Sequence, residues 1–185
     1  MIQKIEFDIG HCDTCDLSLR CKFTPSRSKG MSNSVLYVIA SPTLTDYNKG
    51  YFEGRRNKLI KDFDTQYNFN SYYTSLVKCV TSTILFEHEI KNCSKHFKKE
   101  LYIVAPKIII TIGDVVTKRF LNYNFFNEVV DKPFIIQLNN KDVIVYPIYH
   151  TAYKDRDEMI ITYNKSFSNI AKLYKGFIDK NYINL

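Results

Sequence analysis

The stretch "SVLYVIAS" (34–41) is the first strong strand signal in the chain, because it is an unbroken apolar run rich in β-branched residues. Such a run predicts a strand that is buried on both faces, which is typical of parallel sheets. A similar run, "PKIIITIG" (106–113), predicts a second buried strand that ends at Gly113. Both strands therefore belong in the interior of a covered sheet.

The remaining segments alternate between helix and strand patterns. Residues 87–105 repeat apolar side chains every three or four positions, which predicts an amphipathic helix. Residues 132–150 predict a hairpin with Asn139–Asn140 in its turn and a last strand over 143–148. This alternation predicts the α/β class with a mainly parallel sheet. We further expect a strand over 72–80 and helices over 51–67, 114–121 and about 158–180.

The carboxyl ends of the expected strands are where we look for chemistry. Ligands of open parallel sheets bind beyond these ends. Here they carry Ser41–Pro42, Ser75, Gly113 and His150.

Composition points to a basic protein without a membrane anchor. Lys and Arg number 26 against 19 Asp and Glu, so the formal charge is +7. This favours a polyanion such as nucleic acid as partner, although solubility alone would also explain it. The sequence contains no run of about 18 apolar residues, so we expect no membrane-spanning helix. The stretch "MIQKIEFDIG" (1–10) lacks the pattern of a signal peptide, so we expect an intracellular location, in the cytoplasm or nucleoid.

The cysteines suggest a metal site. Cys12 and Cys15 form a C-x-x-C pair, and Cys79 and Cys93 follow much later in the chain. A thioredoxin-type redox pair would follow the first strong strand, whereas this pair precedes it. A zinc site and an iron–sulfur cluster both need four ligands and remain open, and so does burial of Cys79 and Cys93 as small hydrophobic residues. His88 and His96 flank Cys93 and keep a mixed Cys/His zinc site open.

Several short motifs in one order now resemble a known family, the iron–sulfur (family-4-like) branch of the uracil-DNA glycosylase superfamily. The resemblance covers about residues 12–156. Its motifs are "CDTCDL" (12–17), "GYFEGRRNKLI" (50–60), "SLVKC" (75–79), Cys93, "PKIIITIG" (106–113) and "YHTA" (149–152).

The resemblance implies a fold and a cofactor. The fold would be a single three-layer α/β/α domain over residues 1–185, around a central, mainly parallel four-stranded sheet. Cys12, Cys15, Cys79 and Cys93 would bind a structural [4Fe-4S] cluster, with zinc as the second choice. Cys21 would have no role at this site.

The resemblance also implies an active site at the strand ends. His150 would stabilise the leaving base, and Phe52 would stack on that base. Ser41 and Pro42 would line the base pocket, and Ser75 stands where the family has an asparagine that reads uracil. Lys154 and Arg156 would meet DNA phosphates.

The match departs from the family at the catalytic carboxylate. In "IASPT" (39–43), aligned on Pro42, Ala40 takes the place of the glutamate that acts on water. Asp46 lies four residues after Pro42 and is our candidate for a substitute. Thr151 replaces the proline that follows the histidine.

Three functions follow as hypotheses. The first is a monomeric DNA repair glycosylase that hydrolyses the N-glycosidic bond of uracil or a related base. The second is a catalytically impaired scaffold of the same fold that binds DNA or a replication or repair protein. The third is a small α/β protein with a structural zinc. The departures at Ala40 and Ser75 leave open whether the chain is an active enzyme.

Overall fold

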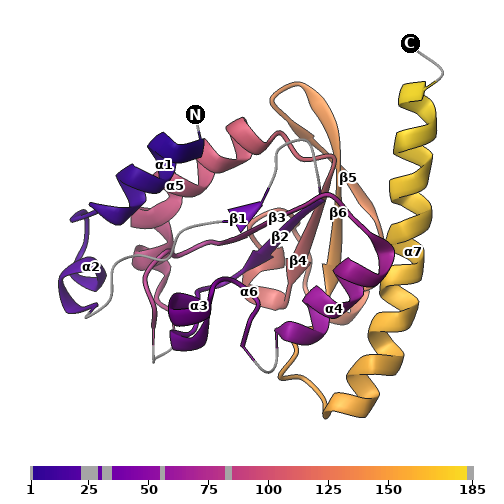
Figure 1. Cartoon of the computed structure of the whole chain (residues 1–185), viewed down its shortest axis with the longest axis horizontal. Coiled ribbons are helices and arrows are strands. Elements are labelled where there is room, and N and C mark those ends of the chain that lie inside the picture. The colour runs from indigo at the N-terminus through magenta and orange to yellow at the C-terminus, as the bar shows by residue number, and fades with distance from the viewer. Residues whose placement is uncertain (1, 22–28, 31–34, 55–56, 82–84, 183–185) are drawn as a thin grey trace.

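The computed structural model describes residues 2–21, 29–30, 35–54, 57–81 and 85–182 (Figure 1). Within these residues a sheet of six strands runs in the order β1-β3-β2-β4-β6-β5. The strands are β1 (Lys29–Gly30), β2 (Val35–Ile39), β3 (Ser71–Ser75), β4 (Ile108–Ile112), β5 (Phe134–Leu138) and β6 (Lys141–Ile148).

The four central strands are parallel, as expected. β2 pairs with β3 and β4, and β4 pairs with β6, all in parallel register. The edge strands β1 and β5 are antiparallel to their neighbours and enlarge the expected four-stranded sheet to six strands. The mainly parallel α/β class is therefore confirmed, and only the strand count differs.

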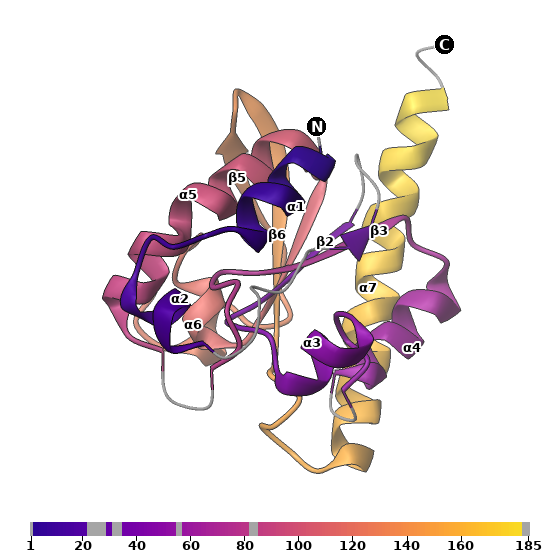
Figure 2. The same ribbon diagram turned by 60° about the vertical axis from the view of Figure 1, so that its left-hand side comes forward.

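Helices cover both faces of the sheet (Figure 2). Tyr37 of β2 packs into one apolar cluster, and its neighbours Leu36 and Val38 pack into the other, because successive side chains of a strand point to opposite faces. The first cluster lies under α4 and α7, and the second under α5 and α6. The helices are α1 (Ile2–Gly10), α2 (Asp16–Arg20), α3 (Leu44–Lys49), α4 (Lys58–Tyr67), α5 (Glu87–Val104), α6 (Asp114–Thr117) and α7 (Arg156–Tyr182).

Three expected helices or strands are shorter than the sequence indicated, and one of them is the helix expected over 114–121, which ends at Thr117. The helix expected over 51–67 is confined to α4, because Gly50 and Phe52 adopt positive φ angles of 103° and 64° that an α-helix excludes; residues 55–56 lie outside the described part of the chain. The strand expected over 72–80 ends at Ser75. Beyond it, the Leu76 N–H still donates to the Ile39 carbonyl, so the chain leaves the sheet beside the end of β2.

The hairpin expected over 132–150 is confirmed. Asn139 and Asn140 have φ angles of 52° and 61°, as a two-residue type I′ turn requires. The turn fixes the register in which Leu138 faces Lys141, and β6 then delivers His150 beyond its carboxyl end.

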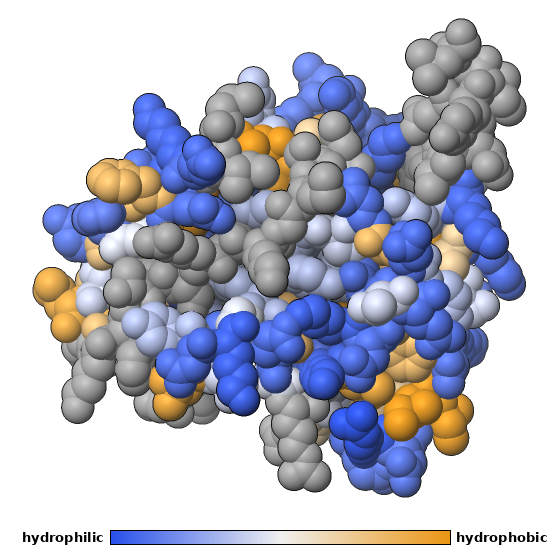
Figure 3. All heavy atoms as spheres, in the orientation of Figure 1, coloured by the Kyte–Doolittle hydropathy of each residue, from blue (hydrophilic) through white to orange (hydrophobic). Residues whose placement is uncertain are grey.

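The surface is mostly polar on the face seen in Figure 1 (Figure 3). Among the described residues, no helix is both long and apolar enough to cross a membrane.

Candidate active site

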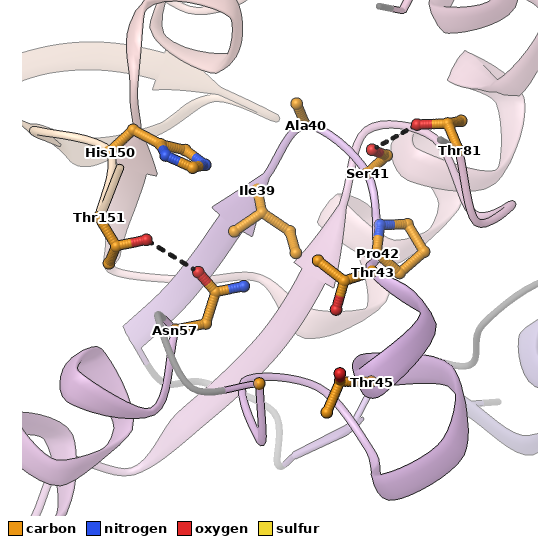
Figure 4. Close-up of a pocket in the computed structure, with 11 residues that line it drawn as sticks. Ile39, Ala40, Ser41, Pro42, Thr43, Thr45, Asn57, Thr81, His150 and Thr151 are labelled. Carbon is orange, nitrogen blue, oxygen red and sulfur yellow. Dashed lines mark hydrogen bonds between the residues drawn. The ribbon is translucent and has the colours of Figure 1, made fainter. Parts of the chain in front are cut away.

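A pocket of about 350 Å³ opens at the carboxyl ends of β2 and β6 (Figure 4). One wall is the loop that follows β2, and the opposite wall includes the segment that follows β6. The pocket brings together five residues named from the sequence, which are Ala40, Ser41, Pro42, His150 and Thr151. Its position agrees with the general location of ligand sites in open parallel sheets.

His150 presents a hydrogen-bond donor at the pocket. The Ala152 N–H donates to its Nδ1 across 3.1 Å, so the neutral imidazole carries its proton on Nε2. The ring side chain is exposed and turned toward Ala40 and Ile39 (Figure 4).

Gly113 makes this placement of His150 possible. A Cβ atom on Gly113 would lie 3.2 Å from the Cβ of His150, and the backbone of Gly113 has a φ of 85°. A larger residue there would push His150 out of place and strain the chain.

Asp46 supports the loop and does not belong to the described lining of the pocket. Its carboxylate accepts hydrogen bonds from Thr43 N at 2.8 Å, from Thr43 Oγ1 at 2.7 Å and from Phe52 N at 2.8 Å. The residue is 2% exposed and closes the capping box of α3 with Thr43. Within the described residues, the carboxylate is thus engaged in holding the backbone on both sides of α3.

Phe52 lies in the core. Its side chain is fully buried, and its ring centroid is 5.0 Å from that of Tyr73 and 6.1 Å from that of Tyr37. Among the described residues, the lining of the pocket does not include Phe52. The structure therefore does not bring the expected stacking residue to the base pocket.

Ser75 is buried and hydrogen-bonded to Tyr51. Its hydroxyl donates to the Val77 carbonyl at 2.7 Å and accepts from the Tyr51 hydroxyl at 2.7 Å. Burial raises the pKa of Tyr51 well above its usual range, so the phenol stays protonated and donates. Both residues are buried, and neither is among the described residues that line the pocket.

Asn57 lines the pocket, and the sequence analysis missed it. Its Oδ1 accepts a hydrogen bond from Thr151 Oγ1 at 3.2 Å, and the residue is only 7% exposed. It directly precedes α4. Because the sequence pattern indicated a helix through this position, its polar side chain gave no signal of a site.

Basic and aromatic side chains follow His150. Lys154 and Arg156 are exposed, and the Nζ of Lys154 lies 3.5 Å from an oxygen of Glu158. Tyr153, 58% exposed, stacks on Tyr149 with 4.5 Å between the ring centroids. This segment offers cations and an aromatic ring beside the pocket.

The four expected ligand cysteines surround one small cavity elsewhere in the fold. Cys12, Cys15, Cys79 and Cys93 line it together with His96. Burial, followed by the neighbouring thiols, raises the pKa of Cys79. Cys21 also lies near this group, because its Sγ donates to the carbonyl of Val80, the residue after Cys79, at 3.7 Å.

Polar groups lie within hydrogen-bond distance of two of these sulfur atoms. Lys78 N donates to Cys93 Sγ at 3.4 Å, and both His96 Nε2 and Thr14 Oγ1 lie 3.2 Å from Cys12 Sγ. The other ring nitrogen of His96 has no partner among the described residues.

The donor set fits a four-thiolate cluster or zinc, because four sulfur atoms face one cavity. The cavity is only about 10 Å³. Within the described ranges, no three Cys, His, Asp or Glu side chains stand at metal-binding separation. Binding would therefore draw the side chains into a new arrangement around the metal.

Comparison with known proteins identifies the family. The family model of the uracil DNA glycosylase superfamily matches residues 28–174. The chain belongs to the uracil-DNA glycosylase superfamily. A type-4 uracil-DNA glycosylase of Sulfurisphaera tokodaii is 27% identical over 164 residues, which cover 82% of this chain and 74% of the relative. These findings confirm the resemblance drawn from the motifs.

This superfamily member has an unusual pocket. No Asp or Glu belongs to the described lining, where Ala40 faces the cavity. The polar groups that do line it are hydroxyls, the His150 imidazole and the Asn57 carboxamide. The pocket can thus donate hydrogen bonds to a ligand, but its described lining offers no carboxylate that could activate water.

Proposed function

We propose that the protein is a DNA repair glycosylase that hydrolyses the N-glycosidic bond of uracil or a related base in DNA. One observation carries this proposal: His150 presents an Nε2 donor at the strand-end pocket of a chain that belongs to the uracil-DNA glycosylase superfamily. In the reaction the oxygen of water bonds to C1′ of the sugar, the C1′–N bond breaks with its electron pair going to the base, and the proton released by water ends on the base.

The pocket supports this chemistry on the side of the leaving group. A target nucleotide must leave the base stack to reach it. A neutral His150 then donates to the oxygen on which negative charge develops, which stabilises the departing base. Water is held by the hydroxyls of Ser41 and Thr45 at the opposite wall. Because no carboxylate lines the described pocket, we expect slow turnover.

Contacts with DNA come from the segment after His150. Lys154 and Arg156 pair with phosphates, and the net charge of +7 strengthens the attraction. The protein acts as an intracellular monomer with DNA as its partner.

The cysteines hold the cofactor in this proposal. Cys12, Cys15, Cys79 and Cys93 bind a [4Fe-4S] cluster, and zinc is the alternative. When bound, the group supplies a cross-link and no catalytic step. It ties the N-terminal segment to α5 and to the chain that follows β3.

A second candidate is a scaffold that binds DNA, or a replication or repair protein, without cleaving the base. The absence of a carboxylate from the described lining of the pocket favours it. A small α/β protein with structural zinc and no nucleic-acid role is disfavoured by the superfamily match.

The experiment uses protein purified under anaerobic conditions. It is incubated with single- and double-stranded DNA that contains one uracil, and abasic sites are measured. We expect abasic sites with the wild type and a loss of about 100-fold in rate for His150→Gln. Tight, salt-dependent binding without abasic sites would support the scaffold instead. A brown protein with iron supports the cluster, whereas a colourless protein with stoichiometric zinc supports the alternative.

A further inference from the structure

We propose that Asn57 is the residue that selects the base, by donating from its carboxamide to a carbonyl oxygen of the bound base. The inference rests on the proposed function and names the substrate class of that pocket. Bases that carry a carbonyl where the normal base has an amino group would be accepted, and cytosine would be rejected.

The first observation is the fixed orientation of the amide. Thr151 Oγ1 donates to Asn57 Oδ1 at 3.2 Å, which uses the acceptor end of the side chain. The Nδ2 end points away from Thr151 and into the pocket, toward Thr43 (Figure 4). Because Asn57 is only 7% exposed, its side chain has little room to turn.

The second observation is that Ser75, the residue expected to read the base, is buried and already hydrogen-bonded within the protein. Ser75 is fully buried and bonded to Tyr51 and to Val77. Asn57 is the one carboxamide in the described lining of the pocket. It can therefore supply the recognition that Ser75 cannot.

The third observation is the pairing with His150. Both side chains reach into the pocket from the same side and face the loop with Ser41 and Pro42 (Figure 4). His150 offers an N–H from Nε2, and Asn57 offers two from Nδ2. A ligand with two carbonyl oxygens, such as uracil, matches these donors. Cytosine presents an amino group at one of those places, where it would meet another donor.

Rejection of a ligand with the wrong donor or acceptor is strong in sites of this kind. A site built to hydrogen-bond a group discriminates by orders of magnitude, because the mismatch leaves buried polar groups unpaired. Asn57→Asp is the sharpest probe, since it keeps the shape and replaces the donors by acceptors. Asn124→Asp is the matched control, because it makes the same charge change at an exposed position outside the described lining of the pocket.

The experiment measures kcat/KM for removal of uracil and of cytosine from the same single-stranded DNA. We expect Asn57→Asp to lower the uracil-to-cytosine ratio by about 100-fold or more, and Asn124→Asp to leave it unchanged. Asn57→Ala is measured in parallel, and circular dichroism shows that each variant is folded. A folded Asn57→Asp protein with the wild-type ratio would overturn the inference.

The experiment also distinguishes a failure of the proposed hydrolysis from a failure of the role inferred for Asn57. If the wild type removes neither base, hydrolysis is refuted, and binding of free uracil and free cytosine is measured by NMR titration. The inference then predicts that the wild type prefers uracil and that Asn57→Asp loses this preference. Equal binding of the two bases by the wild type would overturn it.

Discussion

The phenol oxygen of Tyr51 lies 2.7 Å from the hydroxyl oxygen of Ser75, and both side chains are buried. The Ser75 hydroxyl donates a hydrogen bond to the Val77 carbonyl. The hydrogen bonds therefore run from Tyr51 through Ser75 to Val77. By the resemblance drawn from the motifs, Ser75 takes the place of an asparagine that reads uracil, and these hydrogen bonds occupy its hydroxyl. The open pocket beside it is lined by Asn57 and His150.

Removing the Tyr51 hydroxyl is expected to affect stability and not recognition. Tyr51→Phe should lower the free energy of unfolding by about 1 kcal/mol, which is typical of a lost buried hydrogen bond. Denaturant unfolding measures this change. The uracil-to-cytosine ratio should stay as in the wild type. A shift in that ratio would mean that Ser75 comes within reach of the base.

Asp46 is expected to act as a positioning residue for the loop. Asp46→Asn weakens three hydrogen bonds to Thr43 and Phe52, and we expect a loss of about 1–3 kcal/mol in unfolding free energy. The pH dependence of kcat/KM separates this role from that of a catalytic base. An unchanged acid limb in Asp46→Asn supports positioning, whereas disappearance of that limb would make Asp46 the base.

A carboxylate at position 40 is expected to raise activity. Ala40 lines the pocket, and by the resemblance drawn from the motifs it takes the place of a glutamate. Ala40→Glu should increase kcat by about 10-fold or more, because a base that activates water contributes a factor of about 100 or more in favourable cases. Ala40→Gln is the control, with nearly the same shape and no charge. Equal rates for the two variants would show that water activation does not limit the reaction.

The buried ion pair of Lys78 and Glu100 is expected to be sensitive to loss of one partner. Both residues are at most 1% exposed, and Lys78 Nζ also donates to the Ser75 carbonyl at 2.7 Å. Lys78→Met should cost about 3–5 kcal/mol in unfolding free energy, because it leaves Glu100 buried without its counter-ion. The double variant Lys78→Met with Glu100→Leu should be less destabilised than the single one. A larger loss in the double variant would contradict this account.

His96 is expected to tune the reduction potential of the proposed cluster through Cys12. Its Nε2 lies 3.2 Å from Cys12 Sγ, and a donor to a thiolate stabilises the reduced, more negative cluster. His96→Ala should therefore lower the reduction potential and speed bleaching of the visible spectrum in air. His88→Ala is the control, because His88 stacks on Phe86 and does not belong to the described lining of the cysteine cavity. The same potential in both variants would exclude this role.

The sequence predicts well the features that burial and local backbone geometry determine. β2 and β4 are continuous apolar runs because both of their faces are covered. The sequence pair Asn139–Asn140 predicts the turn, because few residue types tolerate two successive positive φ angles. His150 could be placed at the site because strand ends of a parallel sheet meet at one edge.

Other features depend on contacts between distant parts of the chain. The positive φ of Phe52 stops the expected helix and turns that ring into the core. As a result Asn57 faces the pocket beside Thr151, a neighbour 94 positions away. No local pattern encodes that pairing. Cys21 was set aside for the same reason, since only the fold shows that its thiol contacts the Val80 carbonyl, next to Cys79.

The most direct test of the central claim is a crystal structure of the protein soaked with free uracil. The account predicts uracil in the pocket between Ala40 and His150, with one carbonyl oxygen within hydrogen-bond distance of Asn57 Nδ2 and another of His150 Nε2. Uracil stacked on Phe52 and bonded to Ser75, after displacement of Tyr51, would contradict it, and so would binding only outside this pocket.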